Sequence, residues 1–186
     1  MKFAWDKSLS AAIYRVTKQS KFLRSLAMFC STILLFIMVT AVMMTYGGAD
    51  AMTPMMARFL GSLITMSVPL LFAWLVSYVV QRLVRRPRPF EAGQGDPLIT
   101  MTWTGPSFPS AHAAIAFATA VFGLIVFPDI YGSWLFVFAI LVSLGRVAVG
   151  VHYLLDVIVG AIVGTVAGSL AFMTLLWLII TFNIMD

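Results

Sequence analysis

Long apolar runs constrain this chain more than any other feature of its sequence. About 20 apolar residues are enough to cross the hydrocarbon core of a bilayer as one helix. Hydrophobic residues make up 61% of the chain and charged residues only 10%, whereas about a quarter of an ordinary soluble domain is charged. We therefore predict a polytopic membrane protein that folds as one all-α helical bundle over residues 1–186. Five spans are expected, over Leu26–Tyr46, Phe59–Val80, Ala111–Phe127, Trp134–Val149 and His152–Phe182.

The first 24 residues differ from the rest because they are strongly basic. They hold six of the twelve Lys and Arg residues, and Asp6 is their only acid. Leu9, Ile13 and Val16 recur at helical spacing beside Trp5. A basic amphipathic helix suits the anionic surface of a bilayer, so we predict an interfacial helix over residues 1–24. A disordered basic tail is the alternative, whereas a cleaved signal peptide fits poorly because the following apolar run has full spanning length.

A polar loop interrupts the apolar runs between residues 81 and 109. Its many Pro and Gly residues are incompatible with one continuous helix, and long loops of this kind commonly carry function. Ser110 is the expected N-cap of the helix that follows. If all five spans cross the membrane, this loop, the N-terminus and the turn over residues 146–152 lie on one face. Polar residues from three separate segments can therefore meet there.

The last predicted span carries a stripe of small residues. Gly160, Gly164 and Gly168 recur at every fourth position. Such a stripe lets another helix approach closely, so we interpret it as a packing surface rather than a chemical site.

An unusual group of ionisable residues lies in the stretch GRVAVGVHYLLD, from Gly145 to Asp156. Arg146 precedes His152 by six positions, and Asp156 follows it by four. Residues four apart share a helix face, so the Asp156 carboxylate can accept a hydrogen bond from one ring nitrogen of His152 and leave the other aimed outward. Ionisable groups at membrane depth are costly, which makes this stretch a candidate functional site.

These residue types suit phosphoryl transfer. An imidazole held by a carboxylate can act as a nucleophile, and the guanidinium groups of Arg88 and Arg146 match phosphoryl oxygens. The Ser110 hydroxyl and the backbone N–H groups of Ala111 and His112 form an anion site at a helix N-terminus. The His112 ring can then protonate a leaving oxygen. A zinc site built from the two histidines and the aspartate is the alternative, but the arginines would oppose a bound cation.

At these positions the chain resembles the type 2 phosphatidic acid phosphatases, whose motifs are K-x6-RP, PSGH and SR-x5-H-x3-D. The first motif stands here as Gln81, six residues and Arg88-Pro89, the second as Pro109-Ser110-Ala111-His112, and the third as Gly145-Arg146, five residues, His152, three residues and Asp156. The resemblance covers about residues 81–160, which we interpret as the motif-bearing core.

The resemblance implies a role for each matching residue, and it implies neither a cofactor nor a metal. His152 would be the nucleophile, Asp156 its orienting partner and His112 the general acid for the leaving group. The phosphate would be bound by Arg88, Ser110, the Ala111 backbone N–H and Arg146.

Three positions depart from the motifs. Gln81 stands where the family has lysine, Ala111 where it has glycine, and Gly145 where it has serine. Arg82 and Arg85 are the candidates to replace the missing lysine charge. None of the departures touches the nucleophile, its partner or the acid, so we expect an active enzyme with altered substrate handling.

The short sequences RPRPF, SFPS and GVHYLLD look like the bacterial undecaprenyl diphosphate phosphatase branch of this family. This implies undecaprenyl diphosphate as the substrate, with phosphatidylglycerophosphate, phosphatidic acid and lipid A as alternatives. The expected partners are the lipid substrate and membrane lipids, and no nucleic acid; the oligomeric state stays open. A transporter or proton relay is a rival class, but it would spread ionisable residues across the membrane depth, and a purely structural membrane partner would need no converging clusters.

Two arguments disagree about which side of the membrane carries the site. The resemblance implies the outer face of the cytoplasmic membrane. Eleven of the twelve Lys and Arg residues, however, fall on the predicted site face, and the positive-inside rule assigns such a face to the cytoplasm. We expect the outer face.

Overall fold

The computed structural model describes residues 4–48, 55–101, 105–126 and 130–183, and within these ranges every regular element is an α-helix. The helices are α1 (Ala4–Gln19), α2 (Lys21–Ser31), α3 (Ile33–Gly48), α4 (Met55–Val84), α5 (Ala111–Val126), α6 (Ile130–Ala148) and α7 (Leu154–Asn183). The prediction of an all-α fold is therefore confirmed for the described residues.

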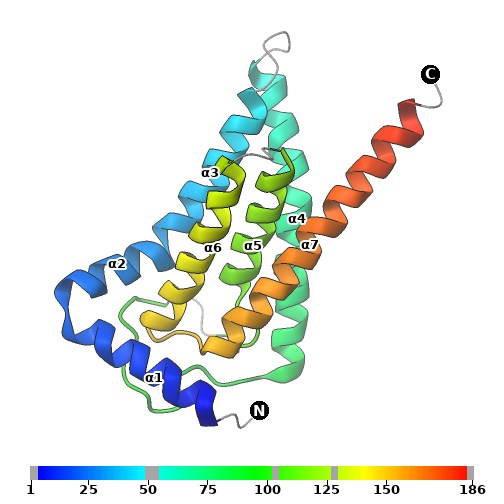
Figure 1. Ribbon diagram of the computed structural model, residues 1–186. Helices are drawn as coiled ribbons and strands as arrows, with labels where there is room; N and C mark the ends of the chain where they lie inside the picture. Colours follow the sequence, from blue (N-terminus) through cyan, green and yellow to red (C-terminus); the bar gives the residue numbers. More distant parts are fainter. Residues whose placement is uncertain (1–3, 49–54, 102–104, 127–129, 184–186) are drawn as a thin grey trace.

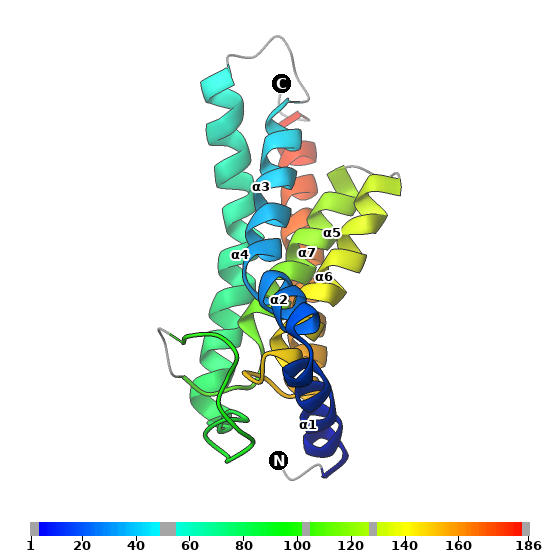
Figure 2. The same ribbon diagram turned by 90° about the vertical axis from the view of Figure 1, so that its left-hand side faces the viewer.

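Helix α5 lies at the centre of the bundle, where it packs against α3, α4, α6 and α7. Figure 1 shows α5 and α6 side by side, next to the longer α4 and α7. Figure 2 shows α1, the loop between α4 and α5, and the turn before α7 together at one end of the bundle. The three segments that were predicted to share a face therefore do lie at one end.

Two helices are long and apolar enough to cross a membrane without a break, over Phe59–Val84 and Leu154–Thr174. The α2–α3 pair passes the same criterion as a bent unit, and its two parts meet at 41°. Helices α5 and α6 are apolar but shorter, with Ala111–Ile125 and Gly132–Ala148 as their apolar parts. The described residues thus show an integral membrane bundle with two or three spans of full length.

The predicted span over Leu26–Tyr46 is divided between two helices, because the chain breaks at Thr32. The hydroxyls of Ser31 and Thr32 both donate to the carbonyl oxygen of Met28, at 3.0 and 2.7 Å, which competes with the backbone ladder of the helix. The carbonyl of Ser31 instead accepts a hydrogen bond from Nη1 of Arg146 at 3.3 Å. The break therefore supplies an acceptor for an arginine of the predicted site.

The glycine stripe of α7 allows α5 to approach closely, as predicted. A Cβ atom at Gly164 would lie 2.1 Å from the carbonyl oxygen of Ala114, and one at Gly160 would lie 2.5 Å from that of Ser110. The facing side of α5 is itself small, with Ala114 and Ala118 completely buried. This contact fixes the start of α5 beside the start of α7.

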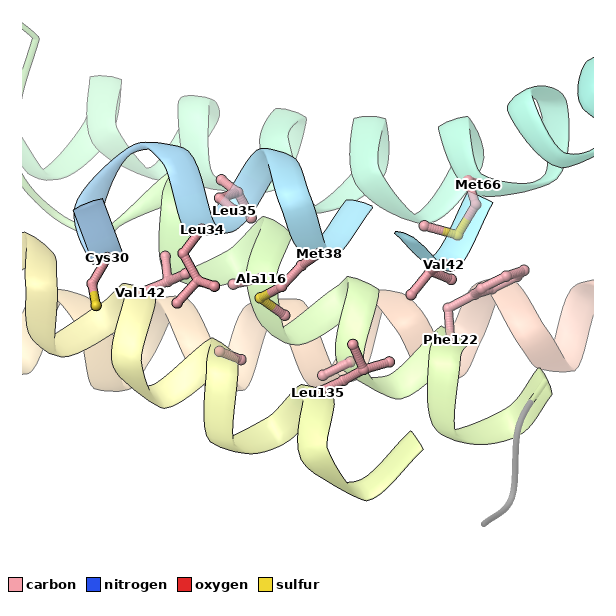
Figure 3. Close-up of a cluster of buried hydrophobic side chains, with 12 residues drawn as sticks. Cys30, Leu34, Leu35, Met38, Val42, Met66, Ala116, Phe122, Leu135 and Val142 are labelled. Carbon is pink, nitrogen blue, oxygen red and sulfur yellow. The ribbon is translucent and has the colours of Figure 1, made fainter. Parts of the chain in front are cut away.

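A hydrophobic cluster holds the α2–α3 pair against α4, α5 and α6 (Figure 3). Its largest fully buried members are Met38 of α3, Met66 of α4 and Val142 of α6. The single cysteine, Cys30, is also part of the cluster and has the packing role that its position in an apolar run indicates. The cluster anchors the bundle next to the end that carries the polar residues.

Helix α1 turns its polar face toward the protein and its apolar face outward. Asp6, Ser10 and Tyr14 are buried, whereas Trp5 and Leu9 are 51% and 46% exposed. The alternative of a disordered tail is therefore wrong for residues 4–19. The two faces of an amphipathic helix are present, but the face that packs on the bundle is the polar one.

Polar contacts attach α1 to the rest of the chain. The Ser10 hydroxyl accepts from the backbone N–H of Leu154 at 2.9 Å, at the first residue of α7. The Tyr14 hydroxyl donates to the carbonyl of Asp96 in the polar loop at 2.6 Å. The N-terminal helix is thus tied to two of the segments that were predicted to form the site.

Candidate active site

A cavity of about 360 Å³ opens at the end of the bundle where the polar segments meet. Six residues that the sequence singled out line it, namely Gln81, Arg88, Ala111, His112, Arg146 and His152. They come from α4, the polar loop, the start of α5, the end of α6 and the turn before α7. The remaining lining is contributed by Thr32, Trp74, Tyr78, Ile99, Thr100 and Met101.

His152 lies in the turn before α7, not inside that helix as the spacing argument assumed. Only 2% of its surface is exposed, and its Nδ1 atom lies 2.8 Å from the carbonyl oxygen of Ser107. A carbonyl can only accept, so Nδ1 carries the proton and Nε2 keeps its lone pair. The neutral ring thus has one nitrogen fixed by the polar loop and the other available to react.

Asp156 lies behind His152 and makes its short hydrogen bonds elsewhere. Its Oδ2 atom is 3.6 Å from Nδ1 of His152 and accepts from the backbone N–H of Tyr153 at 2.8 Å. Its Oδ1 atom accepts from Nη1 of Arg86 at 2.7 Å. Asp156 is therefore close enough to stabilise charge on the imidazole, whereas the Ser107 carbonyl makes the shorter contact to the ring.

Two arginines with a predicted phosphate-binding role are buried at the cavity, each 6% exposed or less. Arg88 donates from Nε to the carbonyl of Gly105 at 2.7 Å and from Nη1 to that of Val151 at 3.1 Å. Arg146 donates to Ser31 through Nη1, and its Nε has no hydrogen-bond partner among the described residues. A buried donor without an acceptor is rare in proteins, and an anion in the cavity would satisfy it.

The start of α5 is built as predicted. Ser110 is its N-cap, with its hydroxyl 3.4 Å from the N–H of Ala113, and its own N–H donates to the carbonyl of Asp156 at 2.9 Å. Ala111 and His112 line the cavity at positions whose N–H groups have no intrahelical acceptor. Ser110 and Asp156 are not among the lining residues, so these two act from behind the cavity wall.

The three positions near the missing lysine lie differently from one another. Gln81 lines the cavity and donates from Nε2 to the carbonyl of Pro109 at 2.8 Å. Arg82 lies over the ring of Tyr78, 4.9 Å from its centroid, and Arg85 donates to the Arg82 carbonyl at 3.1 Å. Neither arginine is among the lining residues, so only Gln81 reaches the cavity.

Close packing between two helices explains why position 145 is a glycine. A Cβ atom there would lie 2.8 Å from the backbone nitrogen of Ser31 and 3.0 Å from the Cβ of Cys30. Helix α2 occupies the space that a serine side chain would need. The departure from the motif therefore accompanies the close approach of α2 to α6.

The cavity lining is positively charged. Arg88 and Arg146 line it, and no carboxylate is among the described lining residues. Two guanidinium groups without a carboxylate in the lining favour an anionic ligand.

The pKa of His152 is lowered from its usual 6.5 to about 4, mainly by burial and also by the positive charges of Arg88 and Arg146, while Asp156 opposes the shift. Burial also lowers the pKa of Arg88, against the opposing effect of Glu91 and Asp156. His152 is therefore unprotonated at neutral pH, as a nucleophile requires.

Sequence reasoning missed three residues of the site. Asp6 and Arg86 contact one another and, through Arg86, Asp156; Ser107 supplies the carbonyl beside His152. Asp6 was visible as the single acid of a basic segment, and Arg86 lies two positions before Arg88. The Ser107 contact uses a backbone atom and left no signal in residue type.

Comparisons with known proteins agree with these features. The profile of the PAP2 superfamily matches residues 62–183. A curated undecaprenyl-diphosphatase from Sulfolobus acidocaldarius is 34% identical over 106 residues, which span 55% of this chain and 50% of that protein. The match thus covers half the length of the relative.

Two solved structures resemble the fold. Aquifex aeolicus LpxE superimposes with a TM-score of 0.61 at 23% identity, covering 92% of this chain and 97% of that one. A transmembrane PAP2-type phosphatidylglycerolphosphate phosphatase from Bacillus subtilis superimposes with a TM-score of 0.64 at 21% identity, covering 92% and 84%. At these identities the likeness concerns the arrangement of the helices.

Proposed function

Because the chain belongs to the PAP2 superfamily, we propose that it is an integral membrane lipid phosphatase whose substrate is undecaprenyl diphosphate. One observation carries the proposal: His152, His112 and Arg146 line one cavity, and the buried Nε of Arg146 has no hydrogen-bond partner among the described residues. A nucleophile, a proton donor and an orphaned cationic donor in one cavity suit the attack on a phosphoryl group.

In the proposed reaction, Nε2 of His152 attacks the terminal phosphorus of the lipid. A P–N bond forms and the P–O bond to the leaving lipid phosphate breaks. Arg88 and Arg146 hold the phosphoryl oxygens, where charge is spread in the transition state. Asp156 and the Ser107 carbonyl stabilise the positive ring that results, since both lie beside Nδ1.

The leaving oxygen takes its proton from the ring of His112. Water then attacks the phosphohistidine while His112 accepts a proton from it. The P–N bond breaks, inorganic phosphate leaves, and both rings return to their starting states. The reaction is proposed to need no metal ion, because the buried guanidinium groups supply the positive charge.

The apolar wall of the cavity supports a lipid substrate. Trp74 and Tyr78 of α4 stack with their ring centroids 5.4 Å apart, and Trp74 is 42% exposed on the outer surface of the bundle. Thr32, at the break between α2 and α3, lines the same cavity. A lipid chain that leaves beside this aromatic pair would stay in the bilayer while its headgroup reaches His152.

The name of the curated relative supports undecaprenyl diphosphate as the substrate. Phosphatidylglycerophosphate is the second candidate, because the PAP2-type phosphatidylglycerolphosphate phosphatase from Bacillus subtilis shares the fold over most of both chains. Phosphatidic acid and lipid A phosphates are further members of the same substrate class.

We also propose that the whole chain forms one domain with five spans, in which α2–α3, α4, α5, α6 and α7 all cross. Alternation of direction along these helices would give the observed grouping of polar segments at one end. Helix α5, with 16 residues, spans about 24 Å, less than the roughly 30 Å of a hydrocarbon core. The α5–α6 hairpin would therefore end below the face opposite the site.

Helix α1 is proposed to lie at the membrane surface. Its outward Trp5, Leu9 and Val16 are about half exposed, and Lys7 and Arg15 are exposed on the same helix. The site is proposed to face the outer side of the cytoplasmic membrane, which rests on the family resemblance and not on the position of α1. Accessibility labelling of single cysteines introduced in the loop over residues 91–100, in a Cys30→Ser background, would decide which side it faces.

A substrate panel tests the proposed function. Purified protein in detergent is expected to release phosphate from undecaprenyl diphosphate faster than from phosphatidylglycerophosphate or phosphatidic acid, and to do so in excess chelator. His152→Ala is expected to abolish the release. Equal activity of His152→Ala and the unaltered protein would contradict the proposal.

A further inference from the structure

Arg86 joins two buried carboxylates that come from opposite ends of the chain. Its Nη2 atom lies 2.5 Å from Oδ2 of Asp6 in α1, and its Nη1 atom lies 2.7 Å from Oδ1 of Asp156 in α7. Both carboxylates are completely buried and Arg86 is 5% exposed. A guanidinium group can bridge in this way because its N–H donors form a rigid planar fork.

The bridge fixes the carboxylate that lies beside the nucleophile. Arg86 donates to Oδ1 of Asp156, and the backbone N–H of Tyr153 donates to Oδ2. The same Oδ2 atom lies 3.6 Å from Nδ1 of His152. Arg86 also lies over the ring of Tyr153, 4.0 Å from its centroid. Arg86 thus supplies one of the two hydrogen bonds that fix the orientation of the Asp156 carboxylate.

Asp6 supplies the second anchor of Arg86. Without it, the buried guanidinium would be left with one carboxylate and an unpaired donor, which is costly. The other oxygen of Asp6 accepts from the backbone N–H of Leu155 at 2.9 Å. Asp6 therefore has two separable functions. It accepts a hydrogen bond at the start of α7, which an uncharged oxygen could also do, and its negative charge pairs with Arg86.

None of Asp6, Arg86 and Asp156 lines the cavity. Their effect on a bound phosphate would therefore pass through His152 rather than through contact with the substrate. Ser10 provides a comparison, because it also binds the start of α7, through the N–H of Leu154, but makes no contact with Arg86 among those the structure records.

We propose that Asp6 is a positioning residue of the phosphatase reaction, which acts on His152 through Arg86 and Asp156 and so makes the N-terminal helix part of the catalytic unit. The proposal rests on the proposed function, in which His152 is the nucleophile. It assigns α1 a role beyond attachment to the membrane surface.

The test is a double-mutant cycle with Asp6→Asn and Arg86→Gln, measured as kcat and KM for lipid phosphate hydrolysis. Asn keeps an oxygen for the N–H of Leu155 but removes the charge that Arg86 needs. We expect Asp6→Asn to lower kcat by about tenfold or more, as is common for groups that orient a functional histidine, with KM within about twofold. In the Arg86→Gln background, Asp6→Asn should cause no further loss, because residues that act in series are not additive.

Ser10→Ala is the matched control, since it removes a helix-start contact of α1 and is expected to leave kcat unchanged. The inference is overturned if Asp6→Asn and Ser10→Ala have the same kcat, or if the effects of Asp6→Asn and Arg86→Gln multiply. A change in KM with unaltered kcat would also overturn it.

Folding is followed by size-exclusion chromatography and thermal melting in detergent. If Asp6→Asn does not yield folded protein, Arg86→Lys decides, because a single ammonium keeps the charge but lacks the fork that bridges two carboxylates. Arg86→Lys should then lower kcat by about tenfold with little change in KM, and unaltered kcat would overturn the inference. An unaltered protein that is inactive on every lipid phosphate contradicts the proposed function instead, whereas an active protein with an active Asp6→Asn variant contradicts only this inference.

Discussion

Nδ1 of His152 lies 2.8 Å from the carbonyl oxygen of Ser107, in the loop before α5. The contact selects the ring tautomer that leaves Nε2 free, and it does so with a neutral acceptor. The Asp156 carboxylate, 3.6 Å away, adds negative charge for the moment when the ring becomes positive. Orientation and charge stabilisation are therefore supplied to His152 by two different groups.

Arg146→Lys is expected to weaken the binding of phosphate or vanadate, measured as competitive inhibition. Lysine lacks an equivalent of the Nε donor, which has no protein partner among the described residues, and cannot form a two-point contact. A hydrogen bond to a charged group contributes about 1.5–3 kcal/mol, so the inhibition constant should rise by about 10- to 100-fold. An unchanged inhibition constant would show that Arg146 does not contact the phosphoryl group.

Gly164→Ala is expected to destabilise the bundle. Its new Cβ would lie 2.1 Å from the carbonyl oxygen of Ala114, and overpacking of this kind typically costs about 1–3 kcal/mol. Gly61→Ala in α4 is the control, because nothing lies within 4 Å of its Cβ and alanine is the better helix former. Thermal melting in detergent should show a lower midpoint for the first variant only; equal midpoints would contradict the close α5–α7 contact.

The lowered pKa of His152 predicts that its ring stays neutral in the folded protein below pH 6.5. Burial lowers this pKa from 6.5 to about 4, so the unfolded chain binds a proton on this ring between those values and the folded protein does not. The free energy of unfolding is therefore not reduced by this group above about pH 6.5, and it falls as the pH is lowered from 6.5 toward 4. In a His112→Gln variant with ¹⁵N-labelled histidine, the His152 resonances should stay those of a neutral ring down to about pH 5. A midpoint near 6.5 would contradict the buried, arginine-flanked environment.

Gln81→Lys restores the charge that the family motif carries. Gln81 lines the cavity and donates to the Pro109 carbonyl, so a lysine at this position could reach a bound phosphoryl group. We expect tighter inhibition by vanadate than in the unaltered protein, with Gln81→Met as the uncharged control. Equal inhibition of all three proteins would mean that the phosphoryl group binds out of reach of position 81.

The sequence was sufficient to identify half of the twelve residues that line the cavity, because the motif spacings specify which side chains meet. His112, His152, Arg88 and Arg146 all line it, and Ser110 caps α5. The placement of these residues followed from the motif spacings and from the burial of charge in an apolar chain, whereas the catalytic or binding role of each stays a prediction.

Other features could not be read from the sequence. The contact between Asp6 and Arg86 joins distant segments, and no residue spacing encodes such a pairing. The break at Thr32 contains neither Gly nor Pro; it depends on two hydroxyls that compete for one carbonyl. The inward polar face of α1 was also hidden, because amphipathicity gives two faces but does not say which one meets protein.

Trapping the covalent intermediate tests the central claim most directly. Purified protein is mixed with undecaprenyl diphosphate labelled in its terminal phosphate, quenched in alkali to preserve phosphohistidine, and mapped by mass spectrometry. We predict phosphate on His152 and none on the protein after His152→Asn. Phosphate on any other residue, or turnover without a phosphorylated His152, would contradict the assignment of His152 as the nucleophile.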